Sequence, residues 1–151
     1  LEKDEQLKNT KEKIIYSNCF TTLAKTVFPE RLKLLGNEIQ KVIETYKPDM
    51  FAIETLFFTT NQKTVMRVSE ARGVILYQAA LHNLPIYEYT PLQIKIAISG
   101  YGRGDKKQIT QMIKQLIVCE KEIKHDDEYD AIAVALTCFA SYKNEKILKN
   151  N

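Results

Sequence analysis

Acidic residues at two places in the sequence have the types and spacing for metal-assisted chemistry. Glu54 interrupts the otherwise apolar run FAIETLFF, where a carboxylate buried without partners would cost several kcal/mol. Asp127 and Asp130 lie three residues apart in HDDEYD, so both project from one side of a helical turn. Carboxylates from a strand and a helix can together hold Mg²⁺ or Mn²⁺, which suits hydrolysis of a phosphodiester.

The helical acids also have a purely structural explanation. Acidic residues near a helix N-terminus cap the first turn and interact favourably with the helix dipole. This explanation suits a single acid better than the four acids of HDDEYD. The wider segment 121–130 is also acidic, with two lysines against five acids. His125 directly precedes the cluster, where it either shuttles protons or leads into the cap. We favour the cap for His125 and leave both readings of the acids open.

A basic segment could supply the positive counterpart of these acids. Three of the five glycines lie between Gly100 and Gly104, which predicts a mobile turn. The cations around this turn are Lys95, Arg103, Lys106 and Lys107. They either contact a phosphate backbone or form a solvated basic turn, although the glycines on both sides of Arg103 would let it reach outward.

Two aromatic residues, Phe57 and Phe58, follow Glu54 closely. Stacking of one of them on an unpaired base would contribute about 1 to 3 kcal/mol. A core position is an equally good interpretation of each ring.

Alternating strand and helix patterns predict an α/β fold that positions these residues. The strands are expected over 13–22, as the second arm of a hairpin, over 49–55, as a buried parallel strand, and over 86–90. Helices are expected over 29–47, 63–83, 91–99 and 106–118 and from Asp126 or Asp127 onward. The helix over 63–83 is apolar on more than one side, so we expect it to be buried on both sides and to suit a subunit interface.

The composition limits the classes of protein that fit. With 151 residues, 44% of them hydrophobic, the chain suits one globular domain spanning 1–151. A net charge of +3 permits nucleic-acid binding without requiring it. Three separated cysteines argue against a zinc knuckle or a disulfide framework and indicate a reducing, cytoplasmic location. No apolar run approaches the roughly 18 to 20 residues that span a bilayer.

The ordered set FAIETLFF, SEARGV, EYTPLQIK, the glycine-rich basic turn and HDDEYDAIAVAL resembles the bacterial RuvC family of Holliday junction resolvases. The resemblance covers most of residues 49–141 and implies an RNase H-like fold, a mixed sheet flanked by helices. It also implies a homodimer that nicks two strands of a four-way DNA junction symmetrically, in recombination and repair. Branch-migration proteins of the RuvA and RuvB type would be partners.

The resemblance assigns roles to residues of this chain. It implies four carboxylates that bind Mg²⁺ or Mn²⁺, with two ions expected in each subunit. Glu54, Asp127 and Asp130 match three of these acids. Phe57 matches an aromatic residue that contacts the junction, and Lys95 and Lys106 match basic positions near the scissile strand. The helix over 63–83 matches the segment that forms the dimer.

One element of the family pattern is not found in the sequence. The first acid of the family lies in a GIDPG pattern on the first strand, and no such pattern occurs here. Because the chain begins with the polar segment LEKDEQLKNTKEK, we expect the first strand and its Asp to lie upstream of Leu1. Two alternatives remain, namely a catalytically silent module that binds branched DNA and an RNase H-like nuclease that processes RNA.

Overall fold

The computed structural model describes residues 11–55, 62–102 and 104–149. The chain divides into two compact units. Unit 1 is formed from Leu1–Cys19, Ala52–Glu54 and Tyr89–Asn151, and unit 2 from Phe20–Phe51 and Thr55–Glu88.

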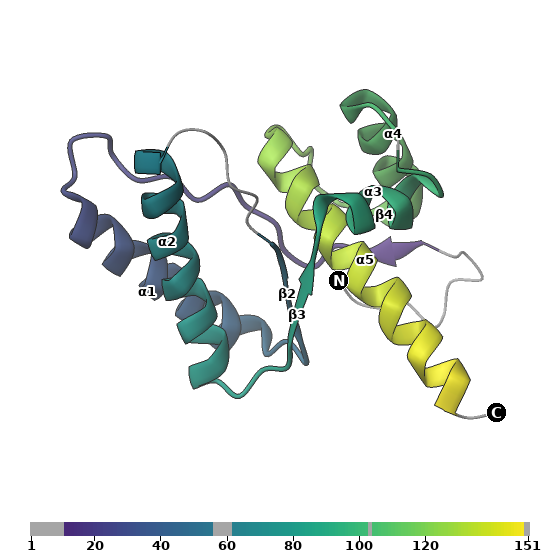
Figure 1. The fold of residues 1–151 in the computed structure, drawn as a ribbon, viewed down its shortest axis with the longest axis horizontal. Coiled ribbons are helices and arrows are strands. Elements are labelled where there is room, and N and C mark those ends of the chain that lie inside the picture. The colour runs from purple at the N-terminus through teal and green to yellow at the C-terminus, as the bar shows by residue number, and fades with distance from the viewer. Residues whose placement is uncertain (1–10, 56–61, 103, 150–151) are drawn as a thin grey trace. The chain divides into compact units, whose positions relative to one another are not determined.

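Two helices, α1 (Phe28–Tyr46) and α2 (Gln62–Leu81), make up most of unit 2 and pack side by side (Figure 1). Pro29 occupies the first turn of α1, where its missing N–H is not needed, and Lys47 ends the helix with a φ of 45°. A methyl group at Gly36 would lie 3.2 Å from Cγ1 of Val74. The glycine therefore allows the two helices to approach closely.

Helix α2 matches the helix predicted over 63–83, but its apolar side chains are not all buried. Ala79 is fully buried, whereas Met66, Tyr77 and Leu81 are 65%, 62% and 56% exposed. The prediction that both sides of this helix are buried is therefore wrong for the single chain. The reason is that α1 covers one side of α2 and leaves large side chains uncovered on the other.

Strands β2 (Phe51–Glu54) and β3 (Ile86–Tyr89) pair in a two-stranded sheet, as Figure 1 shows. Both strands were predicted. The first three residues of β2 are half-buried, but Glu54 at its end is exposed. The expectation of a buried Glu54 is therefore wrong, because the strand ends at this residue and its side chain reaches solvent.

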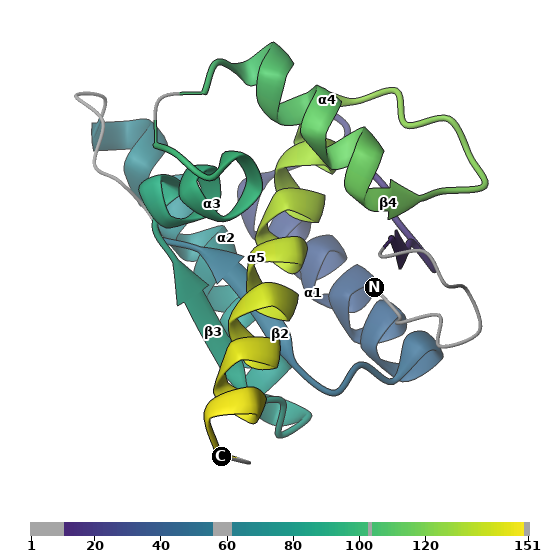
Figure 2. The same ribbon diagram turned by 90° about the vertical axis from the view of Figure 1, so that its right-hand side faces the viewer.

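Three helices build the core of unit 1: α3 (Pro91–Ser99), α4 (Lys106–Leu116) and α5 (Asp126–Lys149). Helix α5 packs against α3 and α4 (Figure 2). Ile94, Ile113 and Ile132 are buried in this core. Thr90 and Asp105 each form a capping box with the glutamine three residues later, which fixes where α3 and α4 begin.

Two short strands, β1 (Glu12–Lys13) and β4 (Ile117–Val118), pair in parallel, with Glu12 opposite Ile117 and Lys13 opposite Val118. The strand predicted over 13–22 is therefore wrong in extent, and the first arm of its predicted hairpin lies outside the described residues. Beyond Ile14, the backbone oxygen of Ser17 accepts a hydrogen bond from Nζ of Lys121 at 2.6 Å instead of joining a ladder.

The helix predicted over 106–118 ends at Leu116, because Ile117 and Val118 form β4. Both residues are β-branched and pair readily in a sheet. None of the described helices is both long enough and apolar enough to cross a membrane.

Candidate active site

A cavity of about 290 Å³ in unit 1 brings predicted acids and predicted cations together. Its polar lining consists of Glu54 from the end of β2, Lys95 from α3, Lys106 from α4 and Asp130 from α5. Apolar side chains, among them Ile94 and Ile109, form the rest of the wall. We call this cavity the carboxylate pocket.

Glu54 and Asp130 face the same space and influence each other electrostatically. Partial burial raises the pKa of Glu54 above its ordinary value, and the negative charge of Asp130 raises it further. The two acidic side chains around one cavity create a local demand for positive charge. A divalent cation or a lysine ammonium group would satisfy it.

Lys106 supplies part of that positive charge. Its Nζ lies 3.2 Å from Oδ2 of Asp126 and 3.8 Å from Oδ2 of Asp130. The hydrogen bond to Asp126 raises the pKa of Lys106, and the charges of Asp130 and Asp127 add to the effect. The capping box of Asp105 places Lys106 at the first position of α4, so the start of this helix determines where the ammonium group lies.

The other predicted residues are placed as follows. Asp127 is exposed on the first turn of α5 and acts on the pKa of Lys106, but it does not line the carboxylate pocket. Lys107 is exposed on α4 and also lies outside the lining. Phe57 and Arg103 lie outside the described residues.

Within the described ranges, no group of three or more His, Cys, Asp and Glu side chains is arranged to hold a metal ion. The metal-ligand set of Glu54, Asp127 and Asp130 therefore stays a prediction. What the structure does show is that Glu54 and Asp130 share one cavity.

One acid of the HDDEYD segment at the start of α5 has a structural role that was not predicted from the sequence. The Glu128 side chain is 4% exposed and accepts hydrogen bonds from Oγ of Ser17 at 2.7 Å and from Nζ of Lys121 at 2.6 Å. These hydrogen bonds lower the pKa of Glu128. A signal existed in the sequence, because Glu128 shares its helical face with the buried residues Ile132 and Leu136 at intervals of four.

The site combines a carboxylate at the end of a strand with a carboxylate near the start of a helix, and two lysines lie beside them on an α/β framework. A site of this class is suited to phosphodiester chemistry. The family described as "Crossover junction endodeoxyribonuclease RuvC" matches residues 5–138. The chain belongs to the RuvC family of crossover junction endodeoxyribonucleases, which are metal-dependent nucleases. The family and the class of enzyme predicted from the sequence are therefore confirmed.

Several relatives of that name cover most of the chain. The protein from Alkaliphilus oremlandii is 48% identical over 132 residues, which make up 87% of this chain and 80% of the relative. The protein from Alkaliphilus metalliredigens is 50% identical over 126 residues, or 83% of this chain and 77% of the relative. The protein from Clostridioides difficile is 42% identical over 145 residues, or 96% and 86%.

Solved structures are also similar. The structure titled "T. thermophilus RuvC in complex with Holliday junction substrate" has a TM-score of 0.79 and 25% identity, covering 85% of this chain and 78% of that one. A second Thermus thermophilus RuvC structure also has a TM-score of 0.79, with 24% identity, covering 89% of this chain and 81% of that one. The predicted α/β, RNase H-like fold is confirmed.

Proposed function

We propose that this protein is a Holliday junction resolvase, a metal-dependent endonuclease that nicks two strands of a four-way DNA junction symmetrically during recombination and repair. The observation that carries the proposal is the carboxylate pocket, where Glu54 and Asp130 lie with Lys95 and Lys106 around one cavity. Membership of the RuvC family supports the same function, as does the similar structure whose title names a Holliday junction substrate.

The residues of the pocket fit a hard divalent cation. Carboxylate oxygens are the donors that Mg²⁺ and Mn²⁺ prefer, and the mutual repulsion of Glu54 and Asp130 would be relieved by a cation. Glu54, Asp127 and Asp130 would hold Mg²⁺ or Mn²⁺, with two ions in each subunit. Bound metal would supply a Lewis acid and lower the pKa of an attacking water.

The chain's own cations would orient the DNA at this site. Lys95 of α3 and Lys106 of α4 line the cavity and would hold the phosphate whose bond is cut. The ion pairs of Lys106 with Asp126 and Asp130 keep its ammonium group beside the acids, so the phosphate would be held near the carboxylates.

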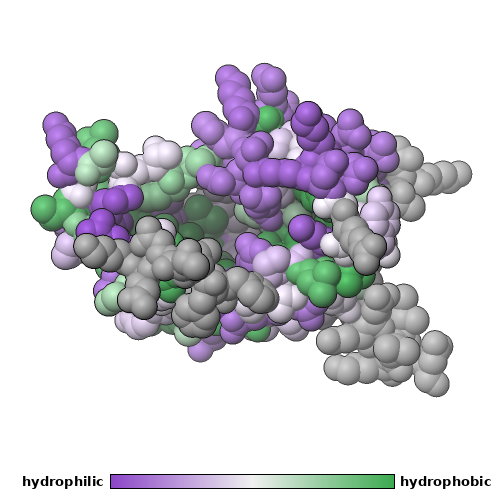
Figure 3. Space-filling view, turned by 45° about the horizontal axis from the view of Figure 1, so that its top comes forward, coloured by the Kyte–Doolittle hydropathy of each residue, from purple (hydrophilic) through white to green (hydrophobic). Residues whose placement is uncertain are grey.

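Further DNA contacts extend beyond the pocket. The outer surface of α4 is strongly hydrophilic (Figure 3), and Lys107, Gln111 and Lys114 are exposed on it. Lys107 and Arg103 would contact the phosphate backbone, and Phe57 would contact unpaired bases. These assignments come from the family resemblance and from the basic character of the segment.

The protein would act as a homodimer, formed through the helix predicted over 63–83. The exposed apolar side chains of α2, Met66, Tyr77 and Leu81, support this interface. A methyl group at Gly73 would meet no atom within 4 Å among the described residues, which leaves room for a second backbone. We further propose that the chain is one nuclease domain, acts in the cytoplasm and cooperates with branch-migration proteins of the RuvA and RuvB type.

A direct test compares a four-way junction with a linear duplex of the same sequence, with and without Mg²⁺ or Mn²⁺, using the full-length protein. We expect cleavage of the junction alone and only with metal, while Glu54→Gln binds the junction without cutting it. Tight binding with no cleavage by the wild type would instead indicate a silent binding module. Preferential cleavage of structured RNA would indicate an RNA-processing nuclease.

A further inference from the structure

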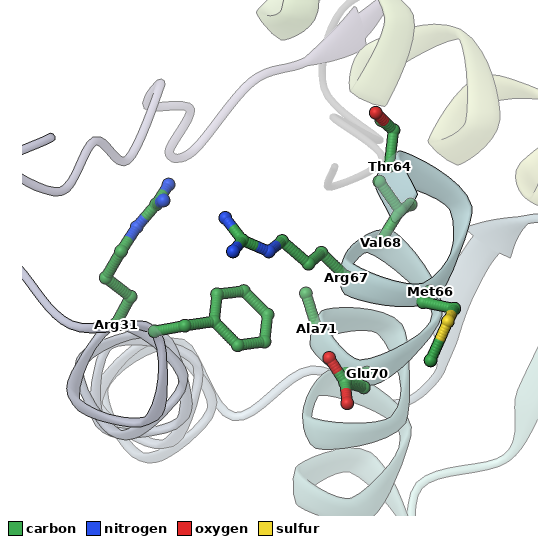
Figure 4. Close-up of a pocket in the computed structure, with 8 residues that line it drawn as sticks. Arg31, Thr64, Met66, Arg67, Val68, Glu70 and Ala71 are labelled. Carbon is green, nitrogen blue, oxygen red and sulfur yellow. The ribbon is translucent and has the colours of Figure 1, made fainter. Parts of the chain in front are cut away.

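A second cavity, of about 750 Å³, lies in unit 2 between the first turns of α1 and the N-terminal half of α2. Phe28 and Arg31 line it from α1, and Met66, Arg67 and Glu70 line it from α2. In Figure 4, the guanidinium groups of Arg31 and Arg67 extend toward each other from opposite sides of the opening. We call this cavity the arginine pocket.

Both guanidinium groups are held in place by neutral neighbours. The guanidinium carbon of Arg67 lies 5.2 Å from the centre of the Phe28 ring, a cation–π contact. Nε of Arg31 donates a hydrogen bond to Oγ1 of Thr22 at 2.7 Å, which leaves its two terminal nitrogens available to an acceptor. Neither contact neutralises the positive charge.

No carboxylate in the described part of the chain forms an ion pair with either of these arginines. Glu70 lines the pocket, yet it pairs with neither Arg31 nor Arg67. By contrast, the guanidinium group of Arg72, on the same helix as Arg67, pairs with Glu88 on β3. Two of the four arginines of the chain therefore line one cavity without an ion pair among the described residues.

An acceptor with several negatively charged oxygens fits this pair of cations. A guanidinium group presents a planar fork of donors that matches phosphate oxygens in a bidentate manner, which an ammonium group does not. The ring of Phe28 is covered by Arg67, so the pocket offers a poor stacking platform for a base. The side chains therefore suit the sugar–phosphate backbone better than a nucleobase.

We propose that the arginine pocket binds the phosphodiester backbone of the DNA junction and serves as a positioning contact separate from the carboxylate pocket. This inference rests on the proposed function, because it takes junction DNA as the ligand. Arg31 and Arg67 each contact phosphate and release counterions, so they contribute affinity without base specificity.

The test measures the dissociation constant of a four-way junction across a salt series, for wild type, Arg31→Gln, Arg67→Gln and the double variant of the full-length protein. Each substitution should weaken binding and reduce the slope of log affinity against log salt by about 0.9, and the double variant by about twice that. Lys41→Gln is the matched control, because it removes one exposed positive charge from α1 outside the pocket. Arg67→Lys should retain most of the slope and lose part of the affinity.

Two outcomes would overturn the inference. An unchanged slope in the folded double variant, verified by thermal unfolding, would show that the pocket does not contact phosphate. The second outcome is that the double variant loses the dimer, as measured by size-exclusion chromatography with light scattering, while the slope of log affinity against log salt per protomer is unchanged. That outcome would show that the arginines receive an acidic side chain from a second copy. If the wild type cleaves junctions while either outcome holds, only this inference fails; if the wild type binds no junction, the proposed function fails with it.

Discussion

The carboxylate pocket and the arginine pocket both present cations, but the partners of those cations differ. In the carboxylate pocket, Lys106 pairs with Asp126 and Asp130 within the chain. In the arginine pocket, Arg31 and Arg67 contact a hydroxyl group and an aromatic ring, and no carboxylate of the described residues neutralises them. The difference fits the roles proposed above, in which the first set of charges serves the chemistry and the second holds a charged ligand.

Ion pairs within the chain weaken the attraction of a cation for DNA phosphate. The field of a lysine that is already paired with two acids is partly cancelled at an outside phosphate, whereas a guanidinium group without an ion pair attracts that phosphate more strongly. The same pairing keeps Lys106 close to Asp130 and so fixes the geometry of the acids. Variants that remove one function should therefore leave the other largely intact.

Among the variants that should retain some activity, Asp130→Asn in the carboxylate pocket has the largest expected effect. This change removes one of the two facing acids and one partner of Lys106, so the single-turnover rate of junction cleavage should fall by about 10²- to 10³-fold. Junction affinity should change little. Asp126→Asn is the matched control, because it also loses a partner of Lys106 but does not line the pocket; an equal loss of rate there would contradict the role given to Asp130.

Glu128→Gln should act on stability. The change weakens two hydrogen bonds to a charged, buried carboxylate, so the free energy of unfolding should fall by about 1.5 to 3 kcal/mol, measured by urea unfolding at pH 7. Because the pKa of Glu128 is lowered in the folded state, this stabilisation is present above the unfolded pKa of about 4.3 and is lost as the pH falls through the folded value.

The difference between wild type and Glu128→Gln should therefore shrink under acidic conditions. Glu122→Gln, an exposed substitution in the same segment, should change the free energy of unfolding by less than about 0.5 kcal/mol. A pH-independent difference for Glu128→Gln would mean that its charge is not what stabilises the contact with Ser17 and Lys121.

The raised pKa of Glu54 predicts a pH dependence of metal binding. Metal binds the ionised carboxylate, so the apparent affinity for Mg²⁺ should fall by about tenfold per pH unit below the pKa of Glu54, starting at a higher pH than for an ordinary glutamate. Titration calorimetry across pH measures this change. Asp130→Asn removes one cause of the raised pKa and should move the transition to lower pH; a transition that does not move would contradict the coupling.

The smallest expected effect is that of Thr22→Val, which tests whether Thr22 holds Arg31 in position in the arginine pocket. Loss of the hydrogen bond that Nε of Arg31 donates to Thr22 should weaken junction binding by at most about tenfold. In an Arg31→Gln background the same substitution should have no further effect, because its partner is gone. Additive effects in this double-mutant cycle would show that Thr22 acts independently of Arg31.

Local features of the structure were predictable from the sequence, and features that depend on distant contacts were not. Pro29 and Asp105 mark helix starts correctly, because capping depends on neighbouring residues. The strand expected over 13–22 shrank to β1, because its extent depends on pairing with β4, more than one hundred residues later. The exposure of Glu54 depends on where β2 ends, which the apolar pattern does not define.

The two pockets also differ in how far their residues could be predicted from the sequence. Glu54, Asp130 and Lys106 were identified because their residue types and motifs stand out, although only the structure shows them in one cavity. Arg31 and Arg67 lie in ordinary amphipathic helices, and they converge where α1 and α2 pack together, with Gly36 of α1 against Val74 of α2. Nothing local in the sequence marks that contact.

The separation of chemistry from binding is tested most directly by single-turnover cleavage of a four-way junction in Mg²⁺ at increasing protein concentration. We predict that the Arg31→Gln, Arg67→Gln double variant needs more protein but reaches the wild-type rate at saturation. We also predict that Glu54→Gln, although it binds the junction, gives no cleavage at any concentration. A double variant that stays slow at saturation, or a Glu54→Gln variant that still cuts, would contradict this separation.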